Sequence, residues 1–202
     1  RAASDGKARG KLLEALQEAA CDHRHRVREV AAEGLARVGV ASGAGFVDEL
    51  VKWIDDDQTW LARAALASLR DGDWLLAIGA EGCTKIVAAG LHRIAREHRA
   101  GRRHEAYRRL CALVPEVVPG IVARHPTVLG AIVEIMLDRR PKDSTGDDED
   151  VRAAIEEVAK KLDKKGQSDR ARALDEALKA TKKAPRDPRW ERLPGKRGRG
   201  KR

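Results

Sequence analysis

The chain has 202 residues, enough for one domain with a sizeable core, and an aromatic content of 3% indicates an aliphatic core between close-packed helices. Its net charge of +9 is unevenly placed: residues 182–202 hold ten Lys and Arg against two acids, which leaves residues 1–181 at only +1. The sequence has no signal-peptide pattern, and no uncharged apolar run reaches the roughly 18 residues of a membrane span. We therefore expect a cytoplasmic protein without a membrane partner.

The first strong pattern in the chain is a repeat. Residues 11–39, KLLEALQEAACDHRHRVREVAAEGLARVG, predict a helical hairpin with helices over about 7–20 and 26–38, the second ended by Gly39. An offset of 34 residues places Asp22 on Asp56 and matches apolar residues throughout: Leu12 with Phe46, Leu13 with Val47, Leu16 with Leu50, Ala20 with Ile54, Val27 with Leu61, Ala31 with Ala65 and Leu35 with Leu69. Repeats of this length predict stacked hairpins in an open superhelix.

The following segments predict further helices in an all-α fold. Asp55–Asp57 are expected to cap a helix over about 58–70, and the spacing then shortens, so that residues 71–82 hold only a short helix before an inner helix near Cys83. The remaining helices are expected over about 45–54, 102–113, 115–124, 126–139, 150–164 and 168–182, with Pro115, Pro119 and Pro126 in first turns.

This pattern divides the chain into four parts. Residues 1–140 form the helical repeats, and 141–150 form an acidic loop. Residues 151–182 form a C-terminal hairpin packed on the repeats, and 183–202 form a disordered basic tail with too few apolar residues for a core.

The segment HRVREVAAEGLARVG resembles the inner helix of a HEAT repeat, in the short bacterial form of phycobilin-lyase-like proteins. The matching features are Asp22 at the turn, the pairs Val27-Arg28 and Ala31-Ala32, and Leu35. The second copy matches at Asp56, Leu61, Ala65 and Leu69 but has Ala62 opposite Arg28, with Arg63 one place on. The resemblance is good over about residues 7–70 and loose to about 140, and the Trp and Tyr signature of tetratricopeptide repeats is absent.

The resemblance implies a right-handed α-solenoid in which Asp22, Asp56 and Arg28 have structural roles. It also implies a groove that binds another macromolecule, without chemistry of its own. We therefore expect a non-enzymatic docking or scaffold module for a protein or ribonucleoprotein partner, with no cofactor. Because the chain begins at Arg1 without an initiator Met, we expect it to belong to a larger complex or a longer chain.

Two groups of residues suggest metal or redox chemistry, and each has a plainer interpretation. Asp22, His23 and His25 fit a solvated polar turn better than a metal site, because two histidines two positions apart point to different sides of a helix or turn. Cys21, Cys83 and Cys111 form no Cys-x-x-Cys pair and are expected to be reduced, buried thiols on helix faces. We expect neither a metal site nor catalytic residues.

The alternative function is a HEAT-like DNA enzyme of the alkylpurine glycosylase sort. Residues 59–69, TWLARAALASL, resemble the Trp-x-x-Arg-Ala-Ala texture of that family, with Trp53, Asp55, Asp56, Trp60 and Arg63 as candidate pocket residues. The interpretation without chemistry is that Trp60 packs between helices and the acids cap one. The spaced pocket residues of that family are not all identifiable in this chain. The net charge of only +1 on residues 1–181 also does not suit a protein that binds duplex DNA.

Two basic segments are candidate binding sites. The tail suits phosphate backbones, acidic protein surfaces or simply solubility, and its candidate residues are Lys182, Lys183, Arg186, Arg189, Trp190, Arg192, Lys196, Arg197, Arg199, Lys201 and Arg202. The secondary patch is either a stripe for phosphate or an acidic partner, or a solvated charged face: Arg93, Arg96, Arg99, Arg102, Arg103, Arg108 and Arg109. RNA and DNA both remain candidate partners of the tail.

Overall fold

The structure is a computed structural model that describes residues 2–137, 145 and 148–183, and all its regular elements over these residues are helical. The α-helices are α1 (Ala2–Ala20), α2 (His25–Ser42), α3 (Val47–Asp55), α4 (Thr59–Ala67), α5 (Gly72–Arg99), α6 (Glu105–Arg124), α7 (Val128–Leu137), α8 (Glu149–Lys164) and α9 (Ser168–Lys183). Two short 3₁₀ helices, η1 (Gly43–Phe46) and η2 (Ser68–Arg70), precede α3 and follow α4.

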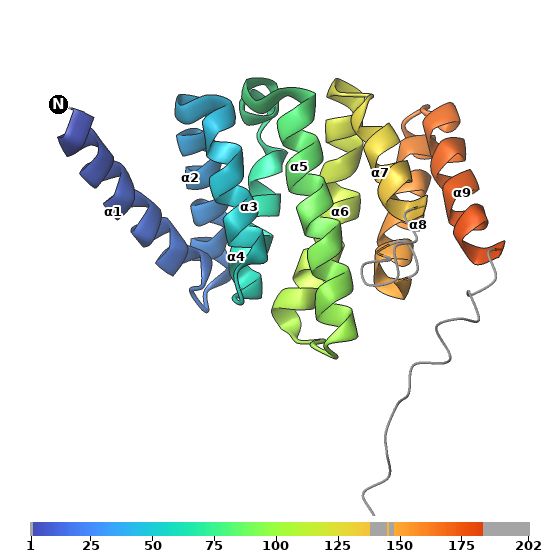
Figure 1. The fold of residues 1–202 in the computed structure, drawn as a ribbon, viewed down its shortest axis with the longest axis horizontal. Helices are drawn as coiled ribbons and strands as arrows, with labels where there is room; N and C mark the ends of the chain where they lie inside the picture. Colours follow the sequence, from blue (N-terminus) through green and yellow to red (C-terminus); the bar gives the residue numbers. More distant parts are fainter. Residues whose placement is uncertain (1, 138–144, 146–147, 184–202) are drawn as a thin grey trace, which may run out of the picture.

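The helices lie side by side in chain order and form two layers (Figure 1). In one layer α2 contacts α4, α4 contacts α6, and α6 contacts α8. In the other layer α3 contacts α5, α5 contacts α7, and α7 contacts α9, while α3–α4, α5–α6 and α8–α9 contact each other across the layers. The core between the layers is aliphatic, as the composition predicts, with the buried rings of Phe46, Trp53, Trp74 and Tyr107 added to it.

The 34-residue offset corresponds to a repeated turn. Asp22 Oδ1 accepts the backbone N–H of Arg24 at 2.7 Å, and Asp56 Oδ1 accepts the backbone N–H of Gln58 at 2.8 Å. Both aspartates therefore stabilise the turn before a helix by bonding the N–H two residues ahead, although neither is the N-cap residue itself. The expectation that Asp22 and Asp56 have structural roles is confirmed, but the expected capping of the helix over about 58–70 by Asp55–Asp57 is wrong, because its N-cap residue is Gln58 and no side chain caps it.

The expected end of the second helix at Gly39 is wrong. Helix α2 continues to Ser42, and Gly43, with φ of 62°, follows it. Gly39 instead permits a close approach, since a Cβ atom there would lie 2.6 Å from Cε3 of the buried Trp74 ring.

The expected break at Pro115 is also wrong. Pro115 and Pro119 both lie inside the continuous helix α6 rather than in first turns. An internal proline costs about 3 kcal/mol through its missing N–H and its ring. In α6 this cost is offset because Leu110, Val114, Val117 and Ile121 stay on one buried face, which would be divided if the helix broke.

The short helix expected after Asp71 is present, and a non-helical Gly79 with φ of 63° separates it from the rest of α5.

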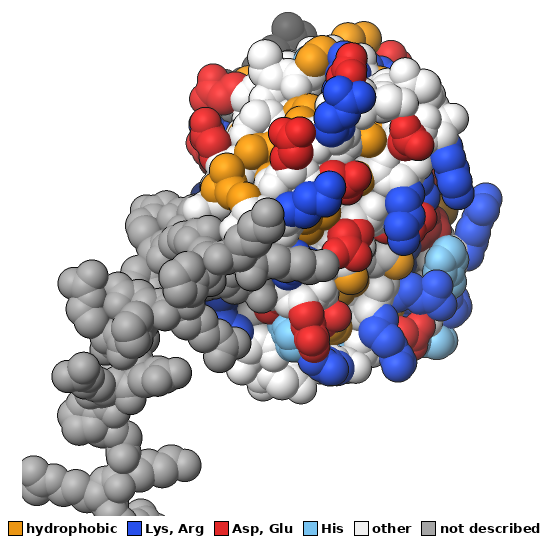
Figure 2. Space-filling model, turned by 90° about the vertical axis from the view of Figure 1, so that its right-hand side faces the viewer, with side chains coloured by type: hydrophobic (Ala, Val, Ile, Leu, Met, Phe, Trp, Pro, Cys, Tyr) orange, Lys and Arg blue, Asp and Glu red, His pale blue; other side chains and the backbone are white. Residues whose placement is uncertain are grey.

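The end of the molecule that carries α9 presents a mixed polar surface, in which acidic and basic side chains alternate (Figure 2). A hollow of about 600 Å³ between α8 and α9 has three acids and three bases in its lining: Glu156, Asp163, Asp175, Lys160, Arg172 and Lys179. Its formal charges cancel, so it offers no electrostatic preference to a partner.

We predict that Ala31→Leu and Ala65→Leu each lower the melting temperature, because both alanines are fully buried and extra methyl groups overpack the core. The cost is about 1–3 kcal/mol for each substitution. Thermal unfolding followed by circular dichroism measures it, with Ala153→Leu at an exposed position of α8 as control. Equal tolerance at the three positions would contradict the repeat register.

Candidate functional site

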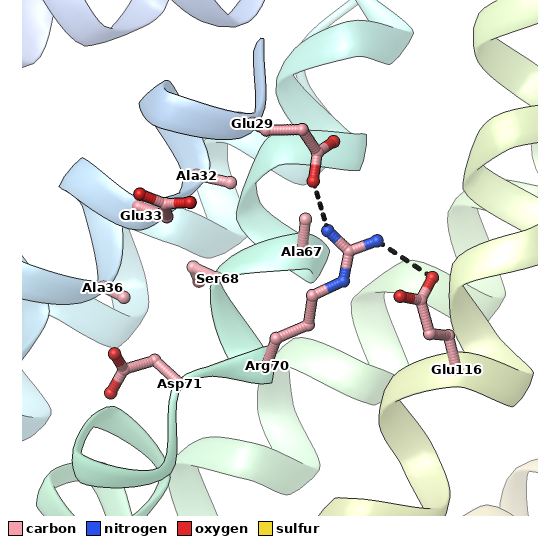
Figure 3. A pocket seen from close by; sticks show the side chains of 9 residues that line it. All are labelled: Glu29, Ala32, Glu33, Ala36, Ala67, Ser68, Arg70, Asp71 and Glu116. Carbon is pink, nitrogen blue, oxygen red and sulfur yellow. Dashed lines mark hydrogen bonds and ion pairs between the residues drawn. The ribbon is translucent and has the colours of Figure 1, made fainter. Parts of the chain in front are cut away.

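A groove of about 470 Å³ crosses α2, the end of α4 with η2, and α6 (Figure 3). Its small lining residues are Ala32, Ala36, Ala67 and Ser68, and its charged lining residues are Glu29, Glu33, Arg70, Asp71 and Glu116. Four carboxylates against one guanidinium give the lining a formal net charge of −3. Because this part of the chain is nearly neutral overall, the groove is a local concentration of negative charge.

Arg70 lies across the groove and joins two helices. Its guanidinium donates to Glu29 Oε2 on α2 at 2.6 Å and to Glu116 Oε2 on α6 at 2.9 Å (Figure 3). The buried Arg63 guanidinium donates to the other oxygen of Glu29. Burial by itself raises the pKa of Glu29, but Arg63 and Arg70 outweigh it and hold that pKa below its usual value, so this carboxylate stays ionised.

Of the other acids of the groove, Glu33 and Asp71 have no ion pair among the described residues, whereas Glu116 is shared with Arg70. Glu33 is exposed and has no ion-pair partner among the described residues. Asp71 uses one carboxylate oxygen to accept the N–H of Trp74 and cap α5, and the Glu116 side chain is 49% exposed. The one hydroxyl, that of Ser68, donates to the Ala65 carbonyl and has no base beside it among the lining residues. The groove is therefore suited to binding a cation.

One expected member of the secondary basic patch, Arg93, is buried inside the protein and does not belong to the surface. Arg93 is 1% exposed and donates to the carbonyls of Ile54, Asp56 and Asp57 at the end of α3. Glu97 lies 2.5 Å from its guanidinium and is equally buried. Burial lowers the pKa of Arg93 although Glu97 opposes this shift, and the guanidinium satisfies carbonyls that a helix end leaves free.

Arg93 has a counterpart one repeat earlier. Arg28 donates to the carbonyls of Asp22 and His23 at 2.7 and 2.8 Å, and the 34-residue offset places these two residues on Asp56 and Asp57. The two repeats therefore bind the same pair of turn carbonyls with a guanidinium. In the second repeat Ala62 stands where Arg28 is expected, and Arg93 from α5 supplies the group instead.

Most of the other arginines of the patch pair with acids. Arg96 lies 3.4 Å from Asp55, Arg102 3.6 Å from Glu97, Arg103 2.8 Å from Glu149 and Arg109 3.7 Å from Glu105. Arg99 and Arg108 are exposed and have no ion-pair partner within the described part of the chain. Much of the positive charge of this segment is therefore neutralised within the chain.

The tail prediction falls almost wholly outside the described residues. Lys182 and Lys183 end α9, and the candidates from Arg186 to Arg202 lie beyond it. The expected acidic loop is described only at Thr145 and from Asp148 onwards, where Asp148 caps α8 through the N–H groups of Asp150 and Val151. The disorder of the tail and its binding role stay predictions.

The candidate glycosylase residues have contacts of their own within the described part of the chain. Trp53 is 2% exposed, and the Arg63 guanidinium is engaged with Glu29. The Arg28 guanidinium covers the Trp60 ring at 4.0 Å, and Asp56 bonds its own turn. The fifth candidate, Asp55, pairs with Arg96 at 3.4 Å, and none of the five lines the groove or the hollow described above.

The cysteines and the long apolar helices do not define a site. Cys83 is fully buried and burial raises the pKa of its thiol to about 11, while Cys21 donates to Gln58 Oε1 at 2.9 Å. By length and composition, two helical stretches, His25–Asp55 and Gly72–Arg99, are apolar enough to cross a membrane. This is weak evidence, because packed core helices pass the same test, and the location of the protein stays a prediction.

No family model, curated protein or solved structure matches the chain. The HEAT likeness therefore stays a resemblance of sequence pattern.

We predict that Arg93→Lys destabilises the fold, because one ammonium group cannot replace a guanidinium that spans several carbonyls. The expected loss in the free energy of unfolding is about 1–3 kcal/mol. Arg93→Ala is expected to cost more, about 3–5 kcal/mol, because it removes the nearest partner of the buried Glu97 and leaves it only the more distant Arg102 at 3.6 Å. Urea unfolding measures both against Arg99→Lys, an exposed control. An unchanged midpoint in Arg93→Lys would show that the turn carbonyls do not need this side chain.

Proposed function

We propose that the protein is a non-enzymatic docking module whose groove across α2, α4 and α6 binds a basic segment of a protein partner. The observation that carries this proposal is the formal charge of −3 on the groove lining, in a part of the chain that is otherwise close to neutral. We further propose that its helices form a right-handed α-solenoid of HEAT-like hairpins. The repeated turn at Asp22 and Asp56 and the two layers of helices support that architecture.

The lining suits an extended segment that carries Lys or Arg. The alanines leave room for an incoming backbone or aliphatic stem, since Ala32, Ala36 and Ala67 project only a methyl group. A cationic head can then pair with Glu33, or share Glu116 with Arg70. Arg70 itself limits the affinity, because an incoming cation competes with it for the same carboxylates.

The tail serves a different partner in this proposal. Its net charge of +8 is opposite in sign to the groove, so it contacts nucleic acid or an acidic protein surface that the groove would repel. A ribonucleoprotein, which presents basic protein segments and phosphates together, can engage both.

We predict that Glu33→Gln and Glu116→Gln weaken binding of a fluorescein-labelled Arg-Ala repeat peptide. An exposed ion pair contributes about 0.2–1 kcal/mol, so the double variant is expected to lose roughly two- to thirtyfold in affinity. Fluorescence anisotropy with the chain truncated after Thr181 measures this without competition from the tail. Glu134→Gln, an exposed acid on α7, is the matched control. If the control weakens binding as much as the double variant, the peptide binds through the overall charge of the protein and not at the groove.

We predict that single-stranded RNA binding resides in the tail. The slope of log affinity against log salt is expected to be about −0.7 for each phosphate contacted, and truncation after Thr181 should flatten it while leaving the melting temperature nearly unchanged. Arg96→Ala, Arg99→Ala and Arg108→Ala together should have a smaller effect in the full chain. RNA binding that survives truncation would instead place the phosphate contacts on the basic patch.

A further inference from the structure

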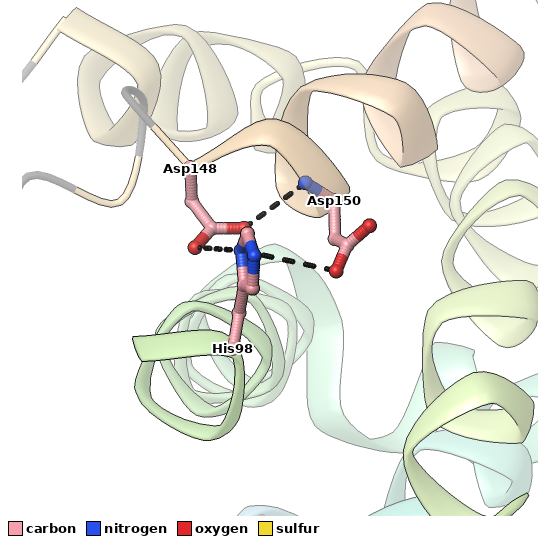
Figure 4. A group of neighbouring side chains, drawn as sticks. All are labelled: His98, Asp148 and Asp150. Atoms are coloured by element: carbon pink, nitrogen blue, oxygen red, sulfur yellow. Dashed lines mark hydrogen bonds and ion pairs between the residues drawn. The ribbon is translucent and has the colours of Figure 1, made fainter. Parts of the chain in front are cut away.

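Side chains from α5 and from the first turn of α8 meet in one cluster (Figure 4). His98 Nδ1 lies 2.8 Å from Asp148 Oδ2 and 3.8 Å from Asp150 Oδ2. One possible ligand atom from each of the three residues lies within 4.8 Å of the other two. The cluster lies outside the acidic groove and is not used by the proposed docking function.

The two carboxylates are held in place by contacts of their own. Asp148 is buried and accepts the N–H groups of Asp150 and Val151 with Oδ1, which leaves Oδ2 facing His98. The hydroxyl of Tyr107 on α6 donates to Asp150 Oδ2 at 2.5 Å. A carboxylate oxygen has two lone pairs, so this oxygen retains one for a cation.

The surroundings of His98 match those of a metal-binding imidazole. Its second nitrogen, Nε2, lies 3.3 Å from Glu149 Oε1, and metal-bound histidines commonly donate their other N–H to a carboxylate. Arg103, which can only donate, also lies against Nε2 and pairs with Glu149 at 2.8 Å, so donation from Nε2 to Glu149 requires its guanidinium to turn from the ring toward Glu149. With His98 neutral, three carboxylates and one guanidinium leave a formal charge of −2, which one divalent cation balances.

We propose that His98, Asp148 and Asp150 bind one divalent transition-metal ion of the zinc class. Zinc takes imidazole nitrogen at about 2.0–2.1 Å and carboxylate oxygen at about 2.0–2.2 Å, which puts neighbouring ligand atoms roughly 3.3 Å apart in a tetrahedron. The observed separations of 2.8 and 3.8 Å lie on either side of that value, so small side-chain adjustments suffice.

The ion would join the C-terminal end of α5 to the N-terminus of α8. It would therefore fix the last hairpin, α8 and α9, to the preceding helices at a second place besides their apolar packing. A metal that binds the folded chain alone raises its stability by mass action.

The test is calorimetric titration of the chelator-treated full chain with Zn²⁺. We expect one ion per chain and a melting temperature that rises with Zn²⁺ and falls again with EDTA. His98→Gln and Asp150→Asn should each weaken Zn²⁺ binding at least tenfold while the helical circular dichroism is retained. His25→Gln, at an exposed histidine beside Glu29, should bind as the native chain does.

Three outcomes would overturn the proposal. The first is no saturable Zn²⁺ binding, which would leave the cluster as a set of polar contacts that joins α5 to the start of α8. The second is equal binding by the native chain, His98→Gln and Asp150→Asn. The third is a thiolate-to-cobalt charge-transfer band on Co²⁺ substitution, which would assign the metal to a cysteine such as Cys111, whose thiol interacts with Tyr107.

Discussion

The helical stack depends on how the carbonyl groups at its turns are satisfied. The turns that follow α1 and α3 contain carbonyls without a partner inside a helix. Arg28 and Arg93 bind these carbonyls, each by spanning two or more of them with one guanidinium. Burying Arg93 carries a large desolvation cost, which the adjacent Glu97 reduces. Arg93 comes from α5, so the same contact also fixes the position of the next hairpin.

The repeat was predictable from the sequence because its signals are local. The 34-residue offset identifies the turns at Asp22 and Asp56, and each aspartate bonds an N–H only two residues away. The replacement of Arg28 by Arg93 in the second repeat was not predictable, since Arg93 lies 37 positions beyond the Asp56 carbonyl that it binds. The sequence marked Arg63 as the nearest substitute, but that residue pairs with Glu29. The position of a residue in the repeat therefore does not decide which side chain binds the turn carbonyls.

Neither the groove nor the cluster of His98, Asp148 and Asp150 was predicted from the sequence, for a related reason. Arg70 is 41 residues from Glu29 and 46 from Glu116, and in the sequence each of them reads as an ordinary surface charge. His98 and Asp148 are 50 residues apart, and Asp148 was predicted only as part of an acidic loop. Stacking brings such residues together because every second helix shares a layer. Local spacing finds turns and core faces, whereas sites between hairpins require the stack itself.

Helix α6 connects the two candidate sites physically. It supplies Tyr107 to the histidine cluster and Glu116 to the groove, nine residues apart and therefore about 14 Å along the axis. It also packs against α4 on one side and α8 on the other. Its continuity through Pro115 consequently matters, because a break there would let the two ends of the helix move separately. An intact α6 therefore keeps Tyr107 and Glu116 at a fixed spacing along one element.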